Sequence, residues 1–280
     1  MTKTFLPVNS PPHPPLIYLR SHLNRVEQTV MDWDKYGNAI ALHETGRTEE
    51  AVLQLQSLEG TSSDPEEKAL VFLAIANCLR QRGKFHEAQL SLNKAFSVLT
   101  KASKVYPRVL FVEALLHEAK GDWKGELERL KYISEQFAPL LQEDEHEDLR
   151  GEVSRHRGIA LLGLGRYREA QPLLEAGALD DYEKEVTLYF LGQCCFQLGD
   201  LQSAKKRMRE ALQIGLHPKH ELMAHYRLAV IHFQLGEYAW SKSEFEWCLA
   251  HSDQGTLERA DILKGLESSD RALQITRGPN

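Results

Sequence analysis

The chain has 280 residues, of which 42% are hydrophobic and 26% are charged, and its formal net charge is −6. These values are typical of a folded globular protein, and the acidic balance argues against nucleic acid as a partner, because binding phosphate usually needs a basic surface. No apolar stretch reaches the roughly 18 residues that a membrane span requires. We therefore expect neither a nucleic acid nor a membrane partner.

The first residues and the cysteines suggest where the protein resides. The start, "MTKTFLPVNSPPHPP", is a poor secretion signal because prolines interrupt its short apolar segment. The four cysteines, in a chain of this length and without a C-x-x-C pair, predict reduced thiols packed as small apolar side chains. A cytoplasmic location is the expectation from both features.

The N-terminal region changes character at residue 16. Five prolines fall within residues 1–15, so we predict an extended or disordered tail there. Over residues 16–31, apolar side chains recur at intervals of three and four, which is typical of one face of a helix. This N-terminal helix either closes the end of the following array or continues into it.

Six similar turns then follow one another, and each carries a glycine. The intervals between these glycines are 37, 38, 44, 34 and 37 residues, and a period of 20 to 50 residues is typical of stacked repeats. In order, the turns read "ETGRTEEA", "QRGKFHEA", "AKGDWKGE", "GLGRYREA", "QLGDLQSA" and "QLGEYAWS".

The residue types at these turns suit a helical hairpin. Glycine ends a helix by taking a left-handed conformation that other residues resist. Five positions later, a small residue lets the second helix approach the first closely. Alanine holds that position in four repeats and Ser241 in the sixth, whereas Glu126 stands there in the third.

This pattern resembles the tetratricopeptide repeat, a helix–turn–helix of 34 residues. The best copy runs from Glu185 to Pro218, and six copies fill residues 32–253. The resemblance implies an all-α fold, a right-handed α-solenoid of helix–turn–helix repeats with terminal capping helices. Residues 254–280 would form the C-terminal capping helix and a short tail, since their apolar residues lie on one face.

A search for reactive groups finds no catalytic or metal-binding motif, so we predict that the protein is not an enzyme and has neither cofactor nor metal. The nearest match to a zinc-protease motif is "HELMAH", whose His220 and His225 are five residues apart instead of four. On a helix these two side chains would point in different directions. No P-loop, G-x-S-x-G or dinucleotide-binding loop is present.

The best functional hint lies at the positions that line the concave face in the resembled family. In the last two repeats these positions are largely apolar and aromatic, which is typical of a protein-binding surface. In earlier repeats they include polar side chains that would contact an acidic peptide. The predicted partner-binding residues are Tyr189, Gln193, Phe196, Met223, Tyr226, Phe233, Asn77, Arg80 and Arg108.

The predicted function is a protein–protein interaction module or scaffold that binds a peptide or helix in this groove. One alternative is a regulatory protein that senses a ligand or peptide and whose groove is partly covered by its own terminal segments. A homodimer interface and a single-stranded RNA binder are further alternatives. The RNA alternative is disfavoured because the inner positions hold few basic residues.

Overall fold

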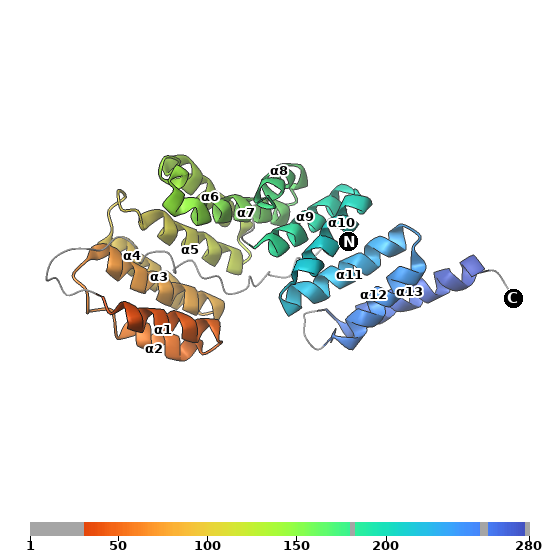
Figure 1. Cartoon of the computed structure of the whole chain (residues 1–280), viewed down its shortest axis with the longest axis horizontal. Helices are drawn as coiled ribbons and strands as arrows, with labels where there is room; N and C mark the ends of the chain where they lie inside the picture. Colours follow the sequence, from red (N-terminus) through yellow and green to blue (C-terminus); the bar gives the residue numbers. More distant parts are fainter. Residues whose placement is uncertain (1–30, 180–182, 253–256, 278–280) are drawn as a thin grey trace. The chain divides into compact units, whose positions relative to one another are not determined.

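The computed structural model describes residues 31–179, 183–252 and 257–277 (Figure 1). The proline-rich tail predicted for 1–15 and all but the last residue of the helix predicted for 16–31 lie outside these ranges. Within them every regular element is a helix and no strand occurs, so the predicted all-α class is confirmed. No helix in these ranges is both long and apolar enough to cross a membrane.

The chain divides into two compact units, residues 1–164 and residues 165–280. The boundary between Leu164 and Gly165 falls inside the turn of the fourth predicted repeat. The first unit holds α1 (Trp33–Glu44), α2 (Thr48–Gln56), α3 (Pro65–Gln81), α4 (Phe85–Val98), α5 (Tyr106–Ala119), α6 (Trp123–Gln136), two short 3-10 turns (Leu140–Gln142 and Asp144–His146) and α7 (Glu147–Gly163). The second unit holds α8 (Tyr167–Gly177), α9 (Lys184–Leu198), α10 (Leu201–Ile214), α11 (Pro218–Gln234), α12 (Tyr238–Ala250) and α13 (Arg259–Arg277).

All six predicted turn glycines have a left-handed backbone, with φ between 72° and 85°. In five of the six turns, all but that of Gly165, the glycine and the next residue also donate hydrogen bonds to carbonyl groups at the end of the first helix. At Gly199, for example, the Asp200 N–H donates to the carbonyl of Cys195, and the Gly199 N–H donates to that of Phe196. The periodic glycines therefore lie in the hairpin turns and adopt the left-handed conformation predicted from the sequence.

Replacing one turn glycine tests this account. Gly83 has φ of 72°, and no atom lies within 4 Å of where a Cβ would be. The Gly83→Ala variant therefore has no steric clash, and its only expected cost is backbone strain. We expect it to lose about 1 kcal/mol of unfolding free energy. Gly37 also has open space around it but lies inside α1 without a positive φ. The Gly37→Ala control should gain about 0.5–1 kcal/mol. Urea unfolding measures both, and an equal gain in the two variants would contradict the proposed role of Gly83.

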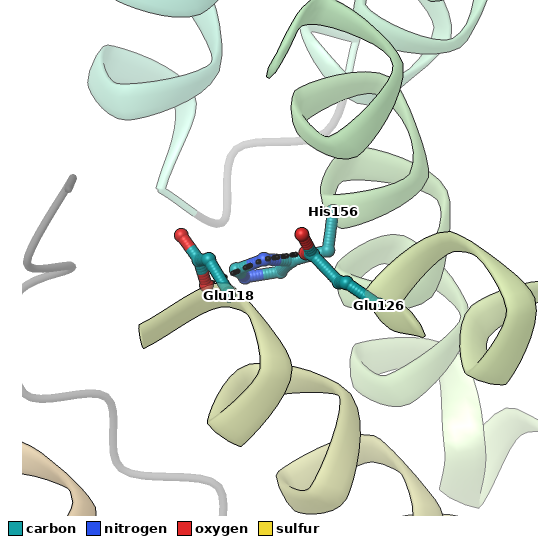
Figure 2. Close-up of side chains that lie close together, drawn as sticks. All are labelled: Glu118, Glu126 and His156. Carbon is teal, nitrogen blue, oxygen red and sulfur yellow. Dashed lines mark ion pairs between the residues drawn. The ribbon is translucent and has the colours of Figure 1, made fainter. Parts of the chain in front are cut away.

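The small residue five positions after each glycine is buried, as predicted. The four alanines, Ala51, Ala88, Ala170 and Ala204, have no exposed surface. Ser241 is equally buried, and its hydroxyl donates to the Ala229 carbonyl at 2.8 Å. In the third hairpin Glu126 takes this place and is also completely buried, close to two charged or titratable side chains from neighbouring helices (Figure 2).

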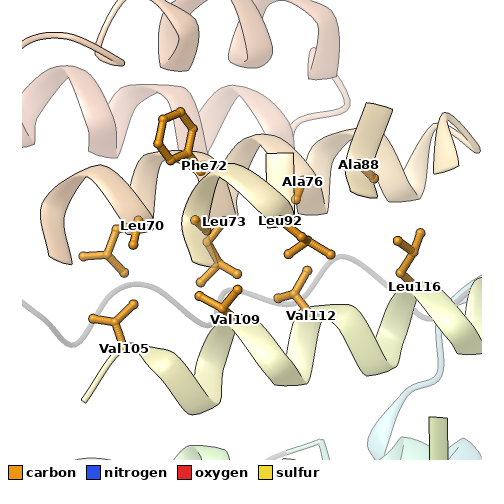
Figure 3. Close-up of a cluster of buried hydrophobic side chains, with 12 residues drawn as sticks. Leu70, Phe72, Leu73, Ala76, Ala88, Leu92, Val105, Val109, Val112 and Leu116 are labelled. Carbon is orange, nitrogen blue, oxygen red and sulfur yellow. The ribbon is translucent and has the colours of Figure 1, made fainter. Parts of the chain in front are cut away.

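Packing between successive hairpins is clear in the first unit. Apolar side chains of α3 and α4 meet a row of side chains on α5 (Figure 3). Leu92 of α4 is fully buried in this cluster. The second hairpin thus covers an apolar face of the third, as short helical pairs must if they are to be stable.

The last helix, α13, closes the second unit in the way predicted for a capping helix. Ile262 joins a buried cluster with Leu222 of α11 and Phe245 of α12. The contact is close, since a Cβ added at Gly265 would lie 2.3 Å from the Phe245 ring. The Ser269 and Ser241 hydroxyls also form a hydrogen bond of 2.9 Å.

Candidate protein-binding face

The nine predicted binding residues divide between the two units. Asn77, Arg80 and Arg108 belong to the first, and the other six belong to the second. We therefore describe each set within its own unit.

In the first unit, Asn77 and Arg80 bind each other. The Arg80 guanidinium donates to the Asn77 amide oxygen at 2.9 Å, and both side chains are buried. Burial lowers the pKa of Arg80, and the nearby Glu118 carboxylate opposes that shift. Both residues therefore have partners within the chain.

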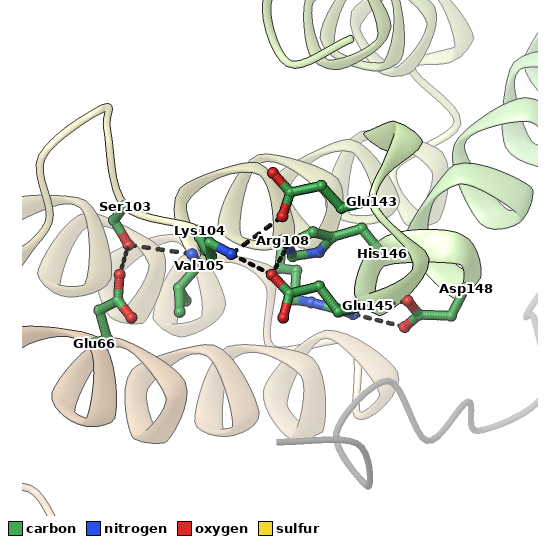
Figure 4. A network of polar contacts seen from close by, with 9 residues as sticks. All are labelled: Glu66, Ser103, Lys104, Val105, Arg108, Glu143, Glu145, His146 and Asp148. Atoms are coloured by element: carbon green, nitrogen blue, oxygen red, sulfur yellow. Dashed lines mark hydrogen bonds and ion pairs between the residues drawn. The ribbon is translucent and has the colours of Figure 1, made fainter. Parts of the chain in front are cut away.

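Arg108 belongs to a network of polar contacts at the N-terminal ends of α5 and α7 (Figure 4). Its guanidinium forms two hydrogen bonds with the Asp148 carboxylate, at 2.8 and 3.0 Å. Beside it, Lys104 pairs with Glu143 at 3.1 Å and also contacts Glu145. Two acidic residues that follow α6, Glu143 and Glu145, are thus connected by ion pairs to Lys104 in the segment before α5.

In the second unit, Tyr189 is only 3% exposed. Its ring stacks on that of His220, with ring centroids 5.1 Å apart, and burial raises its pKa to about 12. The structure therefore places Tyr189 in a packing contact between α9 and the start of α11.

The remaining predicted residues of this unit are accessible to different degrees. Gln193, Phe196, Met223 and Tyr226 are partly exposed. Phe233, near the C-terminal end of α11, is 36% exposed and makes an edge contact with Tyr238, with ring centroids 5.3 Å apart. Tyr226 also contacts Phe245 edge-on, at 5.7 Å between centroids.

Arg227 is a candidate that sequence reasoning missed. Its guanidinium carbon lies 4.5 Å from the centre of the Phe196 ring, a cation–π contact between α11 and α9. Tyr189 and Tyr226 interact with it electrostatically, while burial lowers its pKa. The sequence did offer one indication, because Arg227 directly follows the predicted binding residue Tyr226. One residue turns a helix by about 100°, which places Arg227 at the edge of the helix face that carries the predicted binding residues.

Together these side chains form what we call the α9–α11 face: Gln193, Phe196, Met223, Tyr226 and Arg227. It combines apolar and aromatic surface with one guanidinium. Across the described parts of the chain, no ion pair to Arg227 is present. Such a face suits a ligand that presents an apolar side chain close to a carboxylate.

The cysteines show no sign of activation. All four are free and buried. Burial raises the pKa of Cys78, Cys194 and Cys248 to about 12 in each case. These thiols therefore stay protonated near neutral pH and act as packing groups.

Comparison with known proteins finds a helical-repeat family that matches part of the chain. Residues 156–219 match the family model described as "Tetratricopeptide repeat". A comparison with curated protein sequences found no match. The hairpins and the turn glycines give the chain a fold of helix–turn–helix repeats, and residues 156–219 are similar in sequence to the tetratricopeptide repeat.

Solved structures with the same fold cover most of the chain. One, titled as the APC/C hetero-tetramer Cut9–Hcn1, has a TM-score of 0.68 at 15% identity and covers 86% of this chain. The present chain spans only 42% of that protein's length. PilF of Pseudomonas aeruginosa has a TM-score of 0.62 at 16% identity, with 82% of this chain and 96% of that one covered. A tetratricopeptide repeat protein from Parabacteroides merdae has a TM-score of 0.55 at 11% identity, with 84% and 82% covered. At these identities the likeness concerns the fold alone.

Proposed function

We propose that this protein is a protein–protein interaction scaffold that binds a peptide or helix on the α9–α11 face. The tetratricopeptide repeat fold supports a protein-binding role in general, and the solved structures with this fold include a protein that is part of a hetero-tetramer. The proposed mode of binding is supported by the position of the face, whose partly exposed groups lie on the first helices of two successive hairpins.

The observation that carries the proposal is the contact between Arg227 and Phe196. A half-buried guanidinium stacked on an aromatic ring is held in place before any ligand arrives, so little conformational entropy is lost on binding. Arginine and aromatic side chains are also the residues most often found at binding hot spots. The ligand we propose is a segment with an apolar anchor next to an acidic side chain or a carboxylate.

Peptide selection against the full chain tests this proposal. A random peptide library is displayed and selected on the wild-type protein, and the dissociation constant of the best peptide is measured by fluorescence anisotropy. We expect Phe196→Ala and Arg227→Gln each to weaken binding about 30-fold, the equivalent of about 2 kcal/mol. The matched control is Trp240→Ala on α12, which removes a 61% exposed aromatic side chain outside the face.

The expected peptides carry acidic residues, and the Trp240→Ala variant should bind them like the wild type. Peptides that bind Phe196→Ala and Arg227→Gln as tightly as the wild type would contradict the proposed face. Circular dichroism establishes that each variant keeps its helical content.

A second candidate function is a regulator whose face is partly covered by a terminal segment. The observation in its favour is that Tyr226 packs at the edge of the cluster that contains Ile262 of α13. In a regulator of this kind, a bound peptide would displace α13 from the face, so α13 would lose protease protection, whereas in a permanently open scaffold it would not. The four free, buried thiols also lead us to propose a reducing compartment, the cytoplasm. A homodimer stays a prediction that light scattering can test.

A further inference from the structure

Three buried side chains from successive helices of the first unit converge on one point (Figure 2). They are Glu118 in the last turn of α5, Glu126 in the first turn of α6, and His156 on α7. The His156 Nδ1 lies 3.5 Å from an oxygen of Glu118 and 3.5 Å from an oxygen of Glu126. At most 2% of any of these side chains is exposed.

Glu126 is the residue that needs an explanation. It stands where the other hairpins use alanine or serine, and it has no exposed surface. Within the described residues, neither of its carboxylate oxygens has a hydrogen-bond partner. A buried carboxylate without such partners costs several kcal/mol unless a proton or a cation neutralises it. The Glu126 side chain points toward His156 and Glu118 (Figure 2), so a proton or cation that neutralises its carboxylate would lie among these three residues.

The distances favour a cation. Two ligands of a tetrahedral ion with bonds of about 2.1 Å are separated by about 3.4 Å. The two separations of 3.5 Å agree with that value. One donor atom from each of the three residues lies within 4.8 Å of the others, so small side-chain rotations would bring all three onto one ion.

We propose that Glu118, Glu126 and His156 form a binding site for a divalent transition-metal ion such as Zn²⁺. Two carboxylates and one imidazole supply three ligands of the type that zinc accepts, which leaves a fourth position for water. Because the ligands come from α5, α6 and α7, a bound ion would connect the third hairpin to the first helix of the fourth. We infer a structural ion, since the site is buried between packed helices.

The charges around the site are consistent with this proposal. Burial lowers the pKa of His156, a hydrogen bond and the negative charge of Glu118 raise it, and the positive charges of Arg155 and Arg80 lower it further. An imidazole is a ligand type that zinc accepts. The pKa of Glu126 is raised by burial and by the negative charges of Glu118 and Asp122.

The test uses the full chain, ZnCl2 as the probe, isothermal titration calorimetry and thermal unfolding. The wild type should bind one equivalent of Zn²⁺, and its Tm should rise by about 5 °C at a hundredfold excess over Kd, relative to EDTA. Glu126→Gln keeps the shape and removes the ligand charge, and we expect it to bind at least about 100-fold more weakly. The matched control is Glu128→Gln on the same helix, an exposed residue whose loss should leave both readouts unchanged.

A second variant, Glu126→Ala, restores the residue that the fold uses in four other hairpins. It is therefore expected to fold even if the glutamine variant does not, and to lose Zn²⁺ binding equally. The chain contains 12 histidines and 4 cysteines, and adventitious binding to them would persist in both Glu126 variants. The proposal is overturned if Zn²⁺ leaves the Tm of the wild type unchanged, or if it raises the Tm of the Glu126 variants by the same amount. The peptide-binding experiment addresses the other unit, so each result can be read separately.

Discussion

Glu126→Gln is expected to stabilise the metal-free protein by about 2 kcal/mol at pH 8. Glu126 is completely buried, and its folded-state pKa lies well above the ordinary value of 4.5 because of burial first and neighbouring carboxylates second. At pH 8 the wild type must either bury this charge or hold a proton that the unfolded chain has released. The glutamine variant does neither, so it avoids the cost.

The sign of the pH dependence follows from proton binding. Between pH 4.5 and the raised folded-state pKa, the native carboxyl holds a proton that the unfolded one has lost, so stability falls as the pH rises. The gain from Glu126→Gln should therefore be near zero at pH 4 and grow as the pH rises to 8. His156 has a lowered pKa and contributes the opposite slope below pH 6.5.

The measurement is urea unfolding at pH 4, 6 and 8 in the presence of EDTA. The charged groups that face Glu126 and His156 are Glu118, Asp122, Arg80 and Arg155. They are unchanged in the variant. A gain that does not depend on pH would show that the carboxylate charge is not what the variant removes.

Leu92→Ala is expected to destabilise the first unit by about 3 kcal/mol. Leu92 is fully buried where α4 meets α3 and α5, so the substitution removes packing contacts and leaves a cavity. The same substitution two residues away supplies the control. Leu90 lies on the same helix and is 50% exposed, so Leu90→Ala should change stability by less than about 0.5 kcal/mol.

Urea unfolding followed by circular dichroism distinguishes these variants. Because the chain has two compact units, the transition of the first unit is the one that should move. Equal losses from Leu90→Ala and Leu92→Ala would mean that the contact between the second and third hairpins is not a well-packed core.

The hairpins could be predicted from the sequence because their signals are local and repeated. The glycine has the same role in the turn of all six copies, and a small buried residue follows it five positions later in all but the third, as the structure confirms. The division between Leu164 and Gly165 has no such signal. The glycine pattern continues through it unchanged.

The candidate sites were less accessible to prediction because they depend on contacts between helices. Periodicity indicates which stripe of a helix Tyr189 occupies, but not that His220 of another helix covers it. In the same way, Glu126 stands out in the sequence as a departure from alanine. Its neighbours Glu118 and His156 come from different helices, and only the packing of three helices brings them together.

The two sides of α13 differ in polarity, which has a consequence for what can pack against this helix. Its buried side, with Ile262 and Ser269, fits the preceding hairpin as the first helix of another repeat would. Its exposed residues include Asp261, Lys264, Ser268 and Arg271. Any element that packed on this side of α13 would have to remove these polar groups from water, which costs free energy unless it supplies partners for them.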